Sequence, residues 1–152
     1  MTQEEKQLLL VDLCARLPYV TYYDLSYYGH KTRAIIQEFI AGKESLKSLV
    51  KVNTIVGPIP FENIKPYLRP MSSMTKEELK ELNEKYGNIA YFFIQEPPYY
   101  HGLQAQHYDI GSIAISEFSE IYNWLNAHHF DYRGLIENGL ALEALEEMYK
   151  TE

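Results

Sequence analysis

The segment VTYYDLSYYGHKTRAIIQEFIAG, residues 20–42, decides the fold class, because it predicts strands that follow one another without a long helix between them. Two runs of aromatic and β-branched residues meet near Gly29 and His30, a pattern that predicts a β-hairpin. Residues 32–41, which include IIQEFI, suit either a further strand or a helical turn, and both alternatives stay open. Strands that cluster in this way favour an α+β fold over a doubly wound parallel sheet.

The strand-rich region extends from residue 19 to residue 70 and follows a helix predicted over residues 1–17. Thr2 and Glu5 form a capping box at the start of this helix, and Cys14 falls on its apolar face as a small core residue. A further strand is predicted within residues 45–57. Prolines then recur through the segment FENIKPYLRPMSS (61–73), which we interpret as an edge strand or an extended connector.

The second half of the chain predicts a helix over residues 75–86, which begins at a capping box of Thr75 and Glu78. Residues 88–115 follow as a buried strand and a loop. The helical C-terminal segment, residues 116–149, contains a helix and then a second short helix, which Asp131 starts and Gly139 ends. The expected fold is therefore a small, mostly antiparallel sheet packed with an N-terminal helix, a middle helix and a C-terminal helix-turn-helix.

Length and composition predict one globular domain over residues 1–152, with 46% hydrophobic and 23% charged residues. Cys14 is the only cysteine, so no disulfide forms within the chain. The first 17 residues carry acidic side chains where a signal peptide is basic, and no apolar run has the length of a membrane span. We therefore expect a cytoplasmic protein that has no contact with a membrane.

The formal net charge of −7 excludes generic binding of duplex nucleic acid, which requires lysines and arginines that neutralise phosphates. The one mildly basic stretch runs from Lys31 to Lys51 and comes directly after two tyrosine pairs. Tyrosine rings beside basic side chains can stack on a nucleotide and neutralise its phosphates. The predicted surface for a ligand or a partner comprises eight residues: Tyr22, Tyr23, Tyr27, Tyr28, Lys31, Arg33, Tyr99 and Tyr100.

A second candidate site joins histidines that lie far apart in the sequence. A divalent metal for hydrolysis would need convergent imidazole and carboxylate ligands. The candidate ligands are His101, His107, Asp109, His128 and His129. His128 and His129 are adjacent, so on a helix they point about 100° apart and do not readily share one metal. The two histidines have a simpler role at the end of a helix, where they complement its dipole.

No other catalytic motif occurs in the sequence. There is no G-x-S-x-G nucleophile elbow, no phosphate-binding loop and no dinucleotide fingerprint. We therefore predict no catalytic residue, no bound metal and no cofactor, and we expect that the protein is not an enzyme.

Three phrases resemble a set of uncharacterised small proteins encoded by prophages, phages and other mobile elements of gut anaerobic bacteria. They are EEKQLLLVDLCARLPY (4–19), IKPYLRPMSSMTKEELKEL (64–82) and WLNAHHFDYRGLIENGLALEA (124–144), and together they cover about a third of the chain. The tail departs from the pattern of that set, because EALEEMYK (143–150) stands where a Pro-Glu-Gly turn is usual. The resemblance implies a genetic context, and with it the cytoplasm of a bacterial host cell. It assigns no chemistry to any residue.

Three functions remain as hypotheses. The first is a non-enzymatic binding protein of a phage or mobile element that recognises a host protein or a small anionic ligand, such as a nucleotide, and counters host defence. The second is a metal-dependent hydrolase of phosphoesters that uses the histidine and aspartate cluster. The third is a structural, virion-associated protein. Tyrosine-rich strand edges and the apolar face of the first helix also suit a homo-oligomer.

Overall fold

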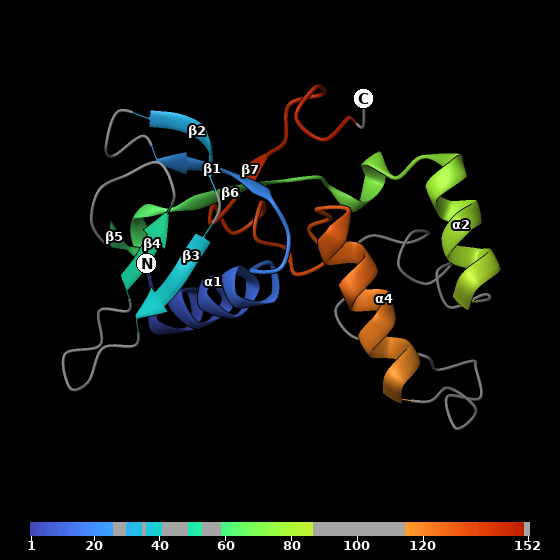
Figure 1. Ribbon diagram of the computed structural model, residues 1–152, viewed down its shortest axis with the longest axis horizontal. Coiled ribbons are helices and arrows are strands. Elements are labelled where there is room, and N and C mark those ends of the chain that lie inside the picture. The colour runs from blue at the N-terminus through green and yellow to red at the C-terminus, as the bar shows by residue number, and fades with distance from the viewer. Residues whose placement is uncertain (26–29, 35, 41–48, 53–58, 87–114, 151–152) are drawn as a thin grey trace. The chain divides into compact units, whose positions relative to one another are not determined.

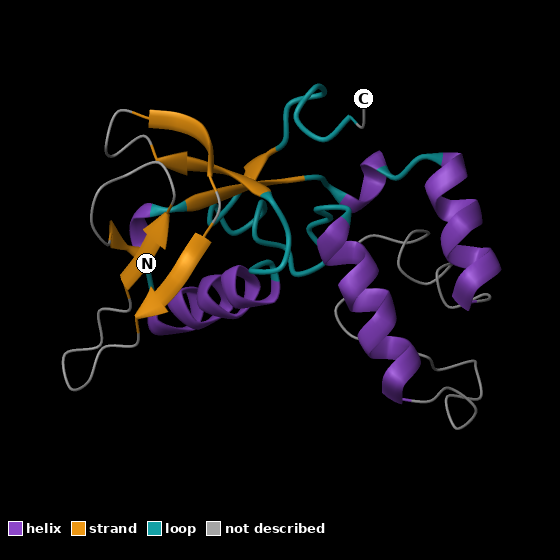
Figure 2. Ribbon diagram, in the orientation of Figure 1, coloured by secondary structure: helices purple, strands orange, loops and turns teal. Residues whose placement is uncertain are grey.

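The computed structural model describes residues 1–25, 30–34, 36–40, 49–52, 59–86 and 115–150, and the chain divides into two compact units. Unit 1 comprises Met1–Leu68 and Leu135–Glu152, and unit 2 comprises Arg69–Gly134. The helices and strands of both units are labelled in Figure 1 and coloured by type in Figure 2. Two compact units can belong to one domain, so the single domain over residues 1–152 stays a prediction.

Unit 1 begins with helix α1 (Gln3–Ala15), whose start matches the predicted capping box. The Glu5 amide donates to the Thr2 hydroxyl oxygen over 3.1 Å, and the Thr2 amide donates to the Glu5 carboxylate over 2.6 Å. These two bonds satisfy amide groups that have no partner within the helix. The predicted helix over residues 1–17 is confirmed, with both ends about one turn or less from their predicted places.

The face that α1 turns to the core differs from the predicted one. The prediction that Cys14 is a core residue is wrong, because Cys14 is exposed. The buried face instead carries Asp12 and Arg16, both 0% exposed, beside Leu9 and Leu13. The Arg16 Nε donates to Asp12 Oδ2 over 2.8 Å, and the Arg16 Nη2 donates to Asp12 Oδ1 over 3.0 Å. This bidentate ion pair neutralises both charges, which makes their burial tolerable.

The strands of unit 1 form two sheets (Figure 2). One has the order β2-β1-β6-β7, and the other has the order β3-β4-β5. The strands are β1 (Thr21–Leu25), β2 (His30–Ala34), β3 (Ile36–Ile40), β4 (Leu49–Val52), β5 (Ile59–Pro60), β6 (Lys65–Leu68) and β7 (Leu142–Glu143). All neighbouring strands are antiparallel except β6 and β7. The predicted hairpin of β1 and β2 is confirmed, and the strand alternative for IIQEFI is the right one.

Strand β6 lies between β1 and β7, so it is neither an edge strand nor a connector as predicted. The prediction rested on Pro66, since a proline cannot donate a hydrogen bond to a neighbouring strand. Strand β7 pairs only with Tyr67 and Leu68, the two residues that follow Pro66. Strand β6 can therefore lie inside the sheet, because its pairing with β7 does not use the backbone amide that Pro66 lacks.

Unit 2 contains helices α2 (Lys76–Tyr86) and α4 (Ile115–Ala127), and its core lies between them. The predicted capping box of α2 is confirmed: the Glu78 amide donates to the Thr75 hydroxyl over 3.1 Å, and the Thr75 amide donates to the Glu78 carboxylate over 2.9 Å. Leu82 is fully buried in this core. The other buried members are Met71, Ile121, Trp124, Leu125 and Phe130.

The predicted C-terminal helix-turn-helix is half right. Helix α4 is present, but residues 128–150 contain turns and the short strand β7 instead of a second helix. Leu135 to Leu140 makes a single turn, in which the Gly139 amide donates to the Ile136 carbonyl and the Leu140 amide donates to the Leu135 carbonyl. Gly139 has a φ of 68°, the left-handed conformation that ends a helical turn. Leu140 and Ala141 then enter the core of unit 1, so the chain continues as a strand.

The α+β fold with a mostly antiparallel sheet is confirmed for the described residues. Among them, no helix combines the length and the apolar character needed to cross a membrane. The predicted strand and loop over residues 88–115 lie outside the described residues, apart from Ile115.

Candidate functional site

Strand β1 alternates between the core and the opposite face of its sheet. Thr21, Tyr23 and Leu25 are buried, whereas Tyr22 and Asp24 are half-buried. Because successive residues of a strand point to opposite faces, Tyr22 and Asp24 share the face that the core does not cover. Two of the tyrosines predicted to bind a ligand, Tyr22 and Tyr23, lie in the described part of the chain. Of these two, Tyr22 is the one whose side chain solvent can reach.

The pairing of β1 with its neighbours brings basic residues to the same face. Arg33 is the register partner of Tyr22, and Lys31 is the register partner of Asp24. Residues directly opposite each other in an antiparallel pair lie on one face of the sheet. We call Tyr22, Asp24, Lys31 and Arg33 the β1–β2 face. Lys65 of β6 is the other partner of Asp24, and its Nζ donates to the Gly139 carbonyl over 2.7 Å.

Tyr149 contacts the β1–β2 face from the C-terminal segment. Its ring lies edge-on to the Tyr22 ring, with centroids 5.4 Å apart and an interplanar angle of 74°. The Tyr22 amide donates to the Tyr149 hydroxyl oxygen over 2.9 Å, and this hydroxyl donates to the Tyr67 carbonyl over 2.8 Å. Burial raises the pKa of Tyr149, so its hydroxyl stays protonated at neutral pH. A neutral phenol therefore joins β1 to β6 just beyond the Tyr23–Pro66 pair.

The other tyrosines predicted to bind a ligand do not join this face. Tyr23 belongs to the core of unit 1 and is 1% exposed. Burial raises the pKa of Tyr23, and its side chain is hydrogen-bonded to that of Thr21. We therefore take Tyr23 out of the candidate site. Four predicted residues lie outside the described residues, namely Tyr27, Tyr28, Tyr99 and Tyr100.

Of the five candidate metal ligands, only His128 and His129 are described. They follow α4 in a Schellman motif, in which the Phe130 amide donates to the Leu125 carbonyl over 2.9 Å and the His129 amide donates to the Asn126 carbonyl over 3.1 Å. His129 has a φ of 62°, a conformation that glycine usually supplies. The two histidines thus end a helix, as their position suggests.

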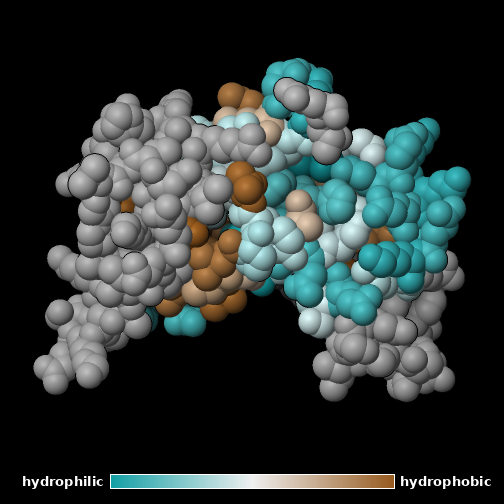
Figure 3. All heavy atoms as spheres, in the orientation of Figure 1, coloured by the Kyte–Doolittle hydropathy of each residue, from teal (hydrophilic) through white to brown (hydrophobic). Residues whose placement is uncertain are grey.

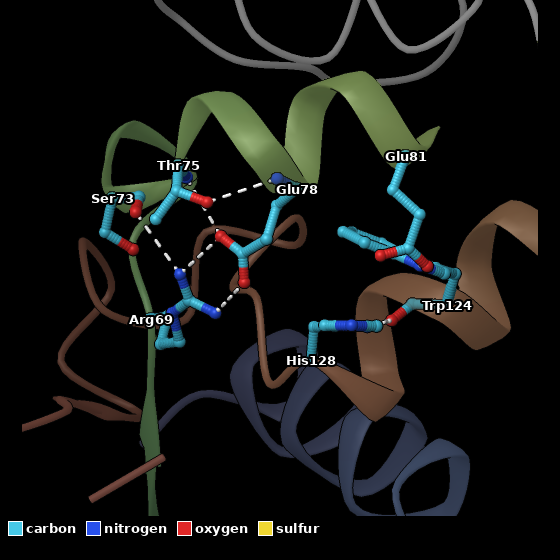
Figure 4. Close-up of polar contacts among 7 residues, drawn as sticks. All are labelled: Arg69, Ser73, Thr75, Glu78, Glu81, Trp124 and His128. Carbon is cyan, nitrogen blue, oxygen red and sulfur yellow. Dashed lines mark hydrogen bonds and ion pairs between the residues drawn. The ribbon is translucent and has the colours of Figure 1, made fainter. Parts of the chain in front are cut away.

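His128 packs against the only tryptophan of the chain. The imidazole stacks on the Trp124 indole at a centroid distance of 3.8 Å, and its Nδ1 lies 2.9 Å from the Trp124 carbonyl oxygen. The Trp124 Nε1 donates to Glu81 of α2 over 3.0 Å (Figure 4). Within the described part of the chain, no three histidine, cysteine, aspartate or glutamate side chains are placed to hold a metal ion.

A polar cluster of unit 2 surrounds Arg69 (Figure 4). Its guanidinium donates to both carboxylate oxygens of Glu78, over 2.6 and 2.8 Å, and to the Ser73 carbonyl over 3.2 Å. It also lies 4.2 Å from the centre of the Phe130 ring. Burial alone would raise the pKa of Glu78, but the hydrogen bonds from Arg69 and Thr75 outweigh it and lower that pKa. Arg69 and Glu78 therefore neutralise each other and hold α2 in place.

Three residues that the structure makes important were not predicted from the sequence, namely Asp12, Arg16 and Tyr149. Asp12 and Arg16 carry opposite charges four residues apart on a helix, a spacing that can indicate an ion pair. Tyr149 has no such local signal, because its partners in β1 and β6 lie more than 80 positions away in the sequence.

No known protein family, curated protein or solved structure matches this chain.

Proposed function

We propose that the protein is a non-enzymatic binding protein of a phage or mobile element, which recognises a small anionic ligand through the β1–β2 face. The observation that carries this proposal is the register of β1 and β2, in which Arg33 lies opposite Tyr22 and Lys31 opposite Asp24. An aromatic ring and two basic residues then occupy neighbouring positions on a face that the core leaves uncovered.

Charge favours an anion at this place. The β1–β2 face and Lys65 together contain three basic residues, Lys31, Arg33 and Lys65, against Asp24 alone. The chain as a whole has a net charge of −7, so this is a local positive area on an acidic protein. Such an area attracts an anion, and arginine binds phosphate with two hydrogen bonds at once.

The aromatic pair of Tyr22 and Tyr149 favours a ligand that also carries a ring. The edge-on contact between the two rings holds Tyr22 in place before a ligand arrives, which lowers the entropic cost of binding. Bases stack on tyrosine with little preference for sequence. A nucleotide combines a base with phosphates, and it is the ligand that we expect. Its binding in the cytoplasm of the bacterial host would remove a signal or substrate from a defence system.

The proposal is tested by isothermal titration of the protein with ATP and, separately, with inorganic triphosphate. We expect ATP to bind, and Arg33→Gln and Tyr22→Ala each to weaken its binding about tenfold or more. A hydrogen bond to a charged group contributes about 1.5–3 kcal/mol, and a base stacked on an aromatic ring contributes about 1–3 kcal/mol. Lys80→Gln is the matched control, because Lys80 is an exposed lysine on α2 that forms an ion pair with its helix neighbour Glu84.

If triphosphate binds as tightly as ATP, the site recognises the phosphates alone, and Tyr22 does not stack on a base. If neither compound binds, or if Arg33→Gln binds ATP as the wild type does, the proposal is wrong. Binding of a host protein that Arg33→Gln abolishes, without binding of ATP, would replace the small ligand by an anionic group on that protein.

A further inference from the structure

The pairing of β1 with β6 stops one position short of a pair that its register allows. Tyr23 lies opposite Pro66 in the last pair of the two strands. One position further along both strands, the same register places Tyr22 opposite Tyr67. Hydrogen-bonded and non-hydrogen-bonded pairs alternate between antiparallel strands, and Pro66 has no amide to donate. The Tyr22–Tyr67 position is therefore one at which the two backbones are expected to bond.

The Tyr149 hydroxyl occupies this position instead. It accepts a hydrogen bond from the Tyr22 amide over 2.9 Å and donates one to the Tyr67 carbonyl over 2.8 Å. These two backbone groups are the donor and the acceptor that bond to each other when antiparallel pairing continues. A side-chain oxygen from the C-terminal segment thus replaces a direct hydrogen bond between β1 and β6.

Departure of Tyr149 would leave neither backbone group without a partner. A buried amide or carbonyl that loses its hydrogen bond destabilises a fold, so such groups are almost always paired. Here the Tyr22 amide and the Tyr67 carbonyl can bond to each other, because their strands are already paired at the next position. The sheet therefore has two complete sets of backbone hydrogen bonds at this place, one with the phenol and one without it.

The segment that carries Tyr149 is mostly exposed to solvent. Its backbone is bonded to β6 at Ala144, whose amide donates to a carbonyl of that strand over 2.7 Å. Beyond this point, the side chains of Glu146 and Glu147 are 86% and 81% exposed, and both form ion pairs with Lys150 of the same segment. Hydrophilic side chains gather over this segment in Figure 3. Segments with few buried contacts open locally at a low free energy.

We propose that Tyr149 is a releasable plug, which switches the pairing of β1 with β6 between two states. In the plugged state, the phenol joins the strands and its ring lies edge-on to the Tyr22 ring. In the released state, residues 145–150 leave the sheet and the Tyr22 amide donates directly to the Tyr67 carbonyl. Release also uncovers the Tyr22 ring, so the β1–β2 face differs between the two states. The inference is independent of the proposed ligand, because it concerns contacts within unit 1 alone.

Hydrogen exchange of the Tyr22 amide in two variants tests the proposal. Tyr149→Phe keeps the ring in place without its hydroxyl, so we expect exchange to become about tenfold faster, the effect of one lost hydrogen bond. Tyr149→Ala also removes the ring and allows the strands to bond directly, so exchange should again be as slow as in the wild type. Leu145→Ala is the matched control, because Leu145 belongs to the same segment but is 65% exposed.

The Tyr23 amide is the internal reference. Neighbouring amides of a strand point to opposite edges, so the Tyr23 amide faces β2 and should exchange alike in the wild type and in all variants. If the Tyr22 amide exchanges as fast in Tyr149→Ala as in Tyr149→Phe, the strands do not bond directly and the proposal is wrong. Faster exchange of the Tyr23 amide in Tyr149→Ala would mean that the sheet needs the phenol, which also overturns the proposal.

A second measurement uses the wild type alone. Chemical-exchange saturation transfer detects minor states that form within milliseconds. We expect a minor state at the amides of Tyr22 and Tyr149 but not at the Tyr23 amide, since global unfolding would affect all three. The shift of the Tyr22 amide in this state should equal its shift in Tyr149→Ala. A wild type without this minor state overturns the proposal, whether or not the variants keep their fold.

Discussion

At the scale of the residue, His129 and Glu78 show how single side chains hold unit 2. His129 adopts a left-handed conformation with a φ of 62°, in which its Cβ crowds the backbone. It accepts a hydrogen bond from the Arg69 amide at its carbonyl, over 2.8 Å, so its backbone has a fixed place in the unit. Glu78 connects the start of α2 to Arg69.

His129→Gly should raise the free energy of unfolding by about 1 kcal/mol, because glycine adopts the left-handed conformation without the steric cost that His129 pays. The measurement is urea unfolding followed by the fluorescence of Trp124, the only tryptophan and a member of the core of unit 2. Ala127→Gly is the control, since Ala127 is the last residue of α4 and glycine there should lower the same free energy by up to about 1 kcal/mol. A destabilised His129→Gly would mean that the imidazole contributes more than the backbone strain costs.

Glu78→Gln should make the free energy of unfolding depend less on pH in the acidic range. The pKa of Glu78 in the folded protein is lower than its ordinary value of 4.5, so the unfolded state binds a proton more readily. The carboxylate therefore stabilises the fold fully above that value, and this contribution disappears as the pH falls through the lowered pKa. The difference in unfolding free energy between wild type and Glu78→Gln should narrow below pH 4.5. A difference that is constant with pH would contradict this account.

At the scale of the element, α1 depends on an ion pair that its core encloses. Asp12→Ala should lower the free energy of unfolding by about 3–5 kcal/mol, because Arg16 then remains buried without its carboxylate. The double variant Asp12→Leu/Arg16→Met should recover most of this loss, since it removes both charges together. Urea unfolding followed by far-ultraviolet circular dichroism measures all three proteins. If the single and the double variant lose the same free energy of unfolding, the unpaired charge of Arg16 is not the cause of the loss.

Tyr149→Phe tests the contact between β1 and β6. The variant keeps the ring against Tyr22 but removes the hydroxyl that joins the Tyr22 amide to the Tyr67 carbonyl. We expect a loss of about 1–3 kcal/mol in stability, because two backbone groups lose their partner. Hydrogen exchange of the Tyr22 amide should become faster, whereas exchange of the Leu82 amide in α2 should not change. An unchanged Tyr22 amide would contradict the assigned hydrogen bond.

Local patterns in the sequence predicted local structure well. Capping boxes gave the starts of α1 and α2, and the aromatic runs gave the hairpin of β1 and β2. Features that depend on distant parts of the chain were not predictable. The place of β6 between β1 and β7 requires residues 142 and 143, and the turns after α4 form because Leu140 and Ala141 pack into unit 1.

In the candidate site, too, local patterns predicted some residues, whereas others depend on distant parts of the chain. Alternation along β1 and the hairpin predicted near Gly29 and His30 were enough to place Tyr22, Lys31 and Arg33 on paired strands. They were not enough to show that Tyr23 enters the core, because a tyrosine pair always sends one ring to each face and the sequence did not say which. Tyr149 joined the site through a contact that spans 127 positions, which no local pattern encodes.

At the scale of the whole molecule, unit 1 is built from two separate stretches of chain, and unit 2 from one continuous stretch. A chain truncated after Gly134 retains all of unit 2 but loses β7 and Tyr149 from unit 1. We expect Trp124 in this truncated chain to keep its buried emission and a cooperative urea transition. Hydrogen exchange in β1 and β6 should become fast. Loss of the Trp124 transition on truncation would show that unit 2 needs residues 135–150.

The two-part composition of unit 1 has a consequence for synthesis on the ribosome. The N-terminal helix and hairpin leave the exit tunnel early, yet β7 and Tyr149 follow only after all of unit 2 has been translated. Unit 2 can therefore fold while translation continues, because its residues are contiguous. The first 68 residues cannot complete their sheet until β7 has been synthesised. During that interval the side of β6 that β7 will cover is an open strand edge, which a chaperone or another nascent chain can reach.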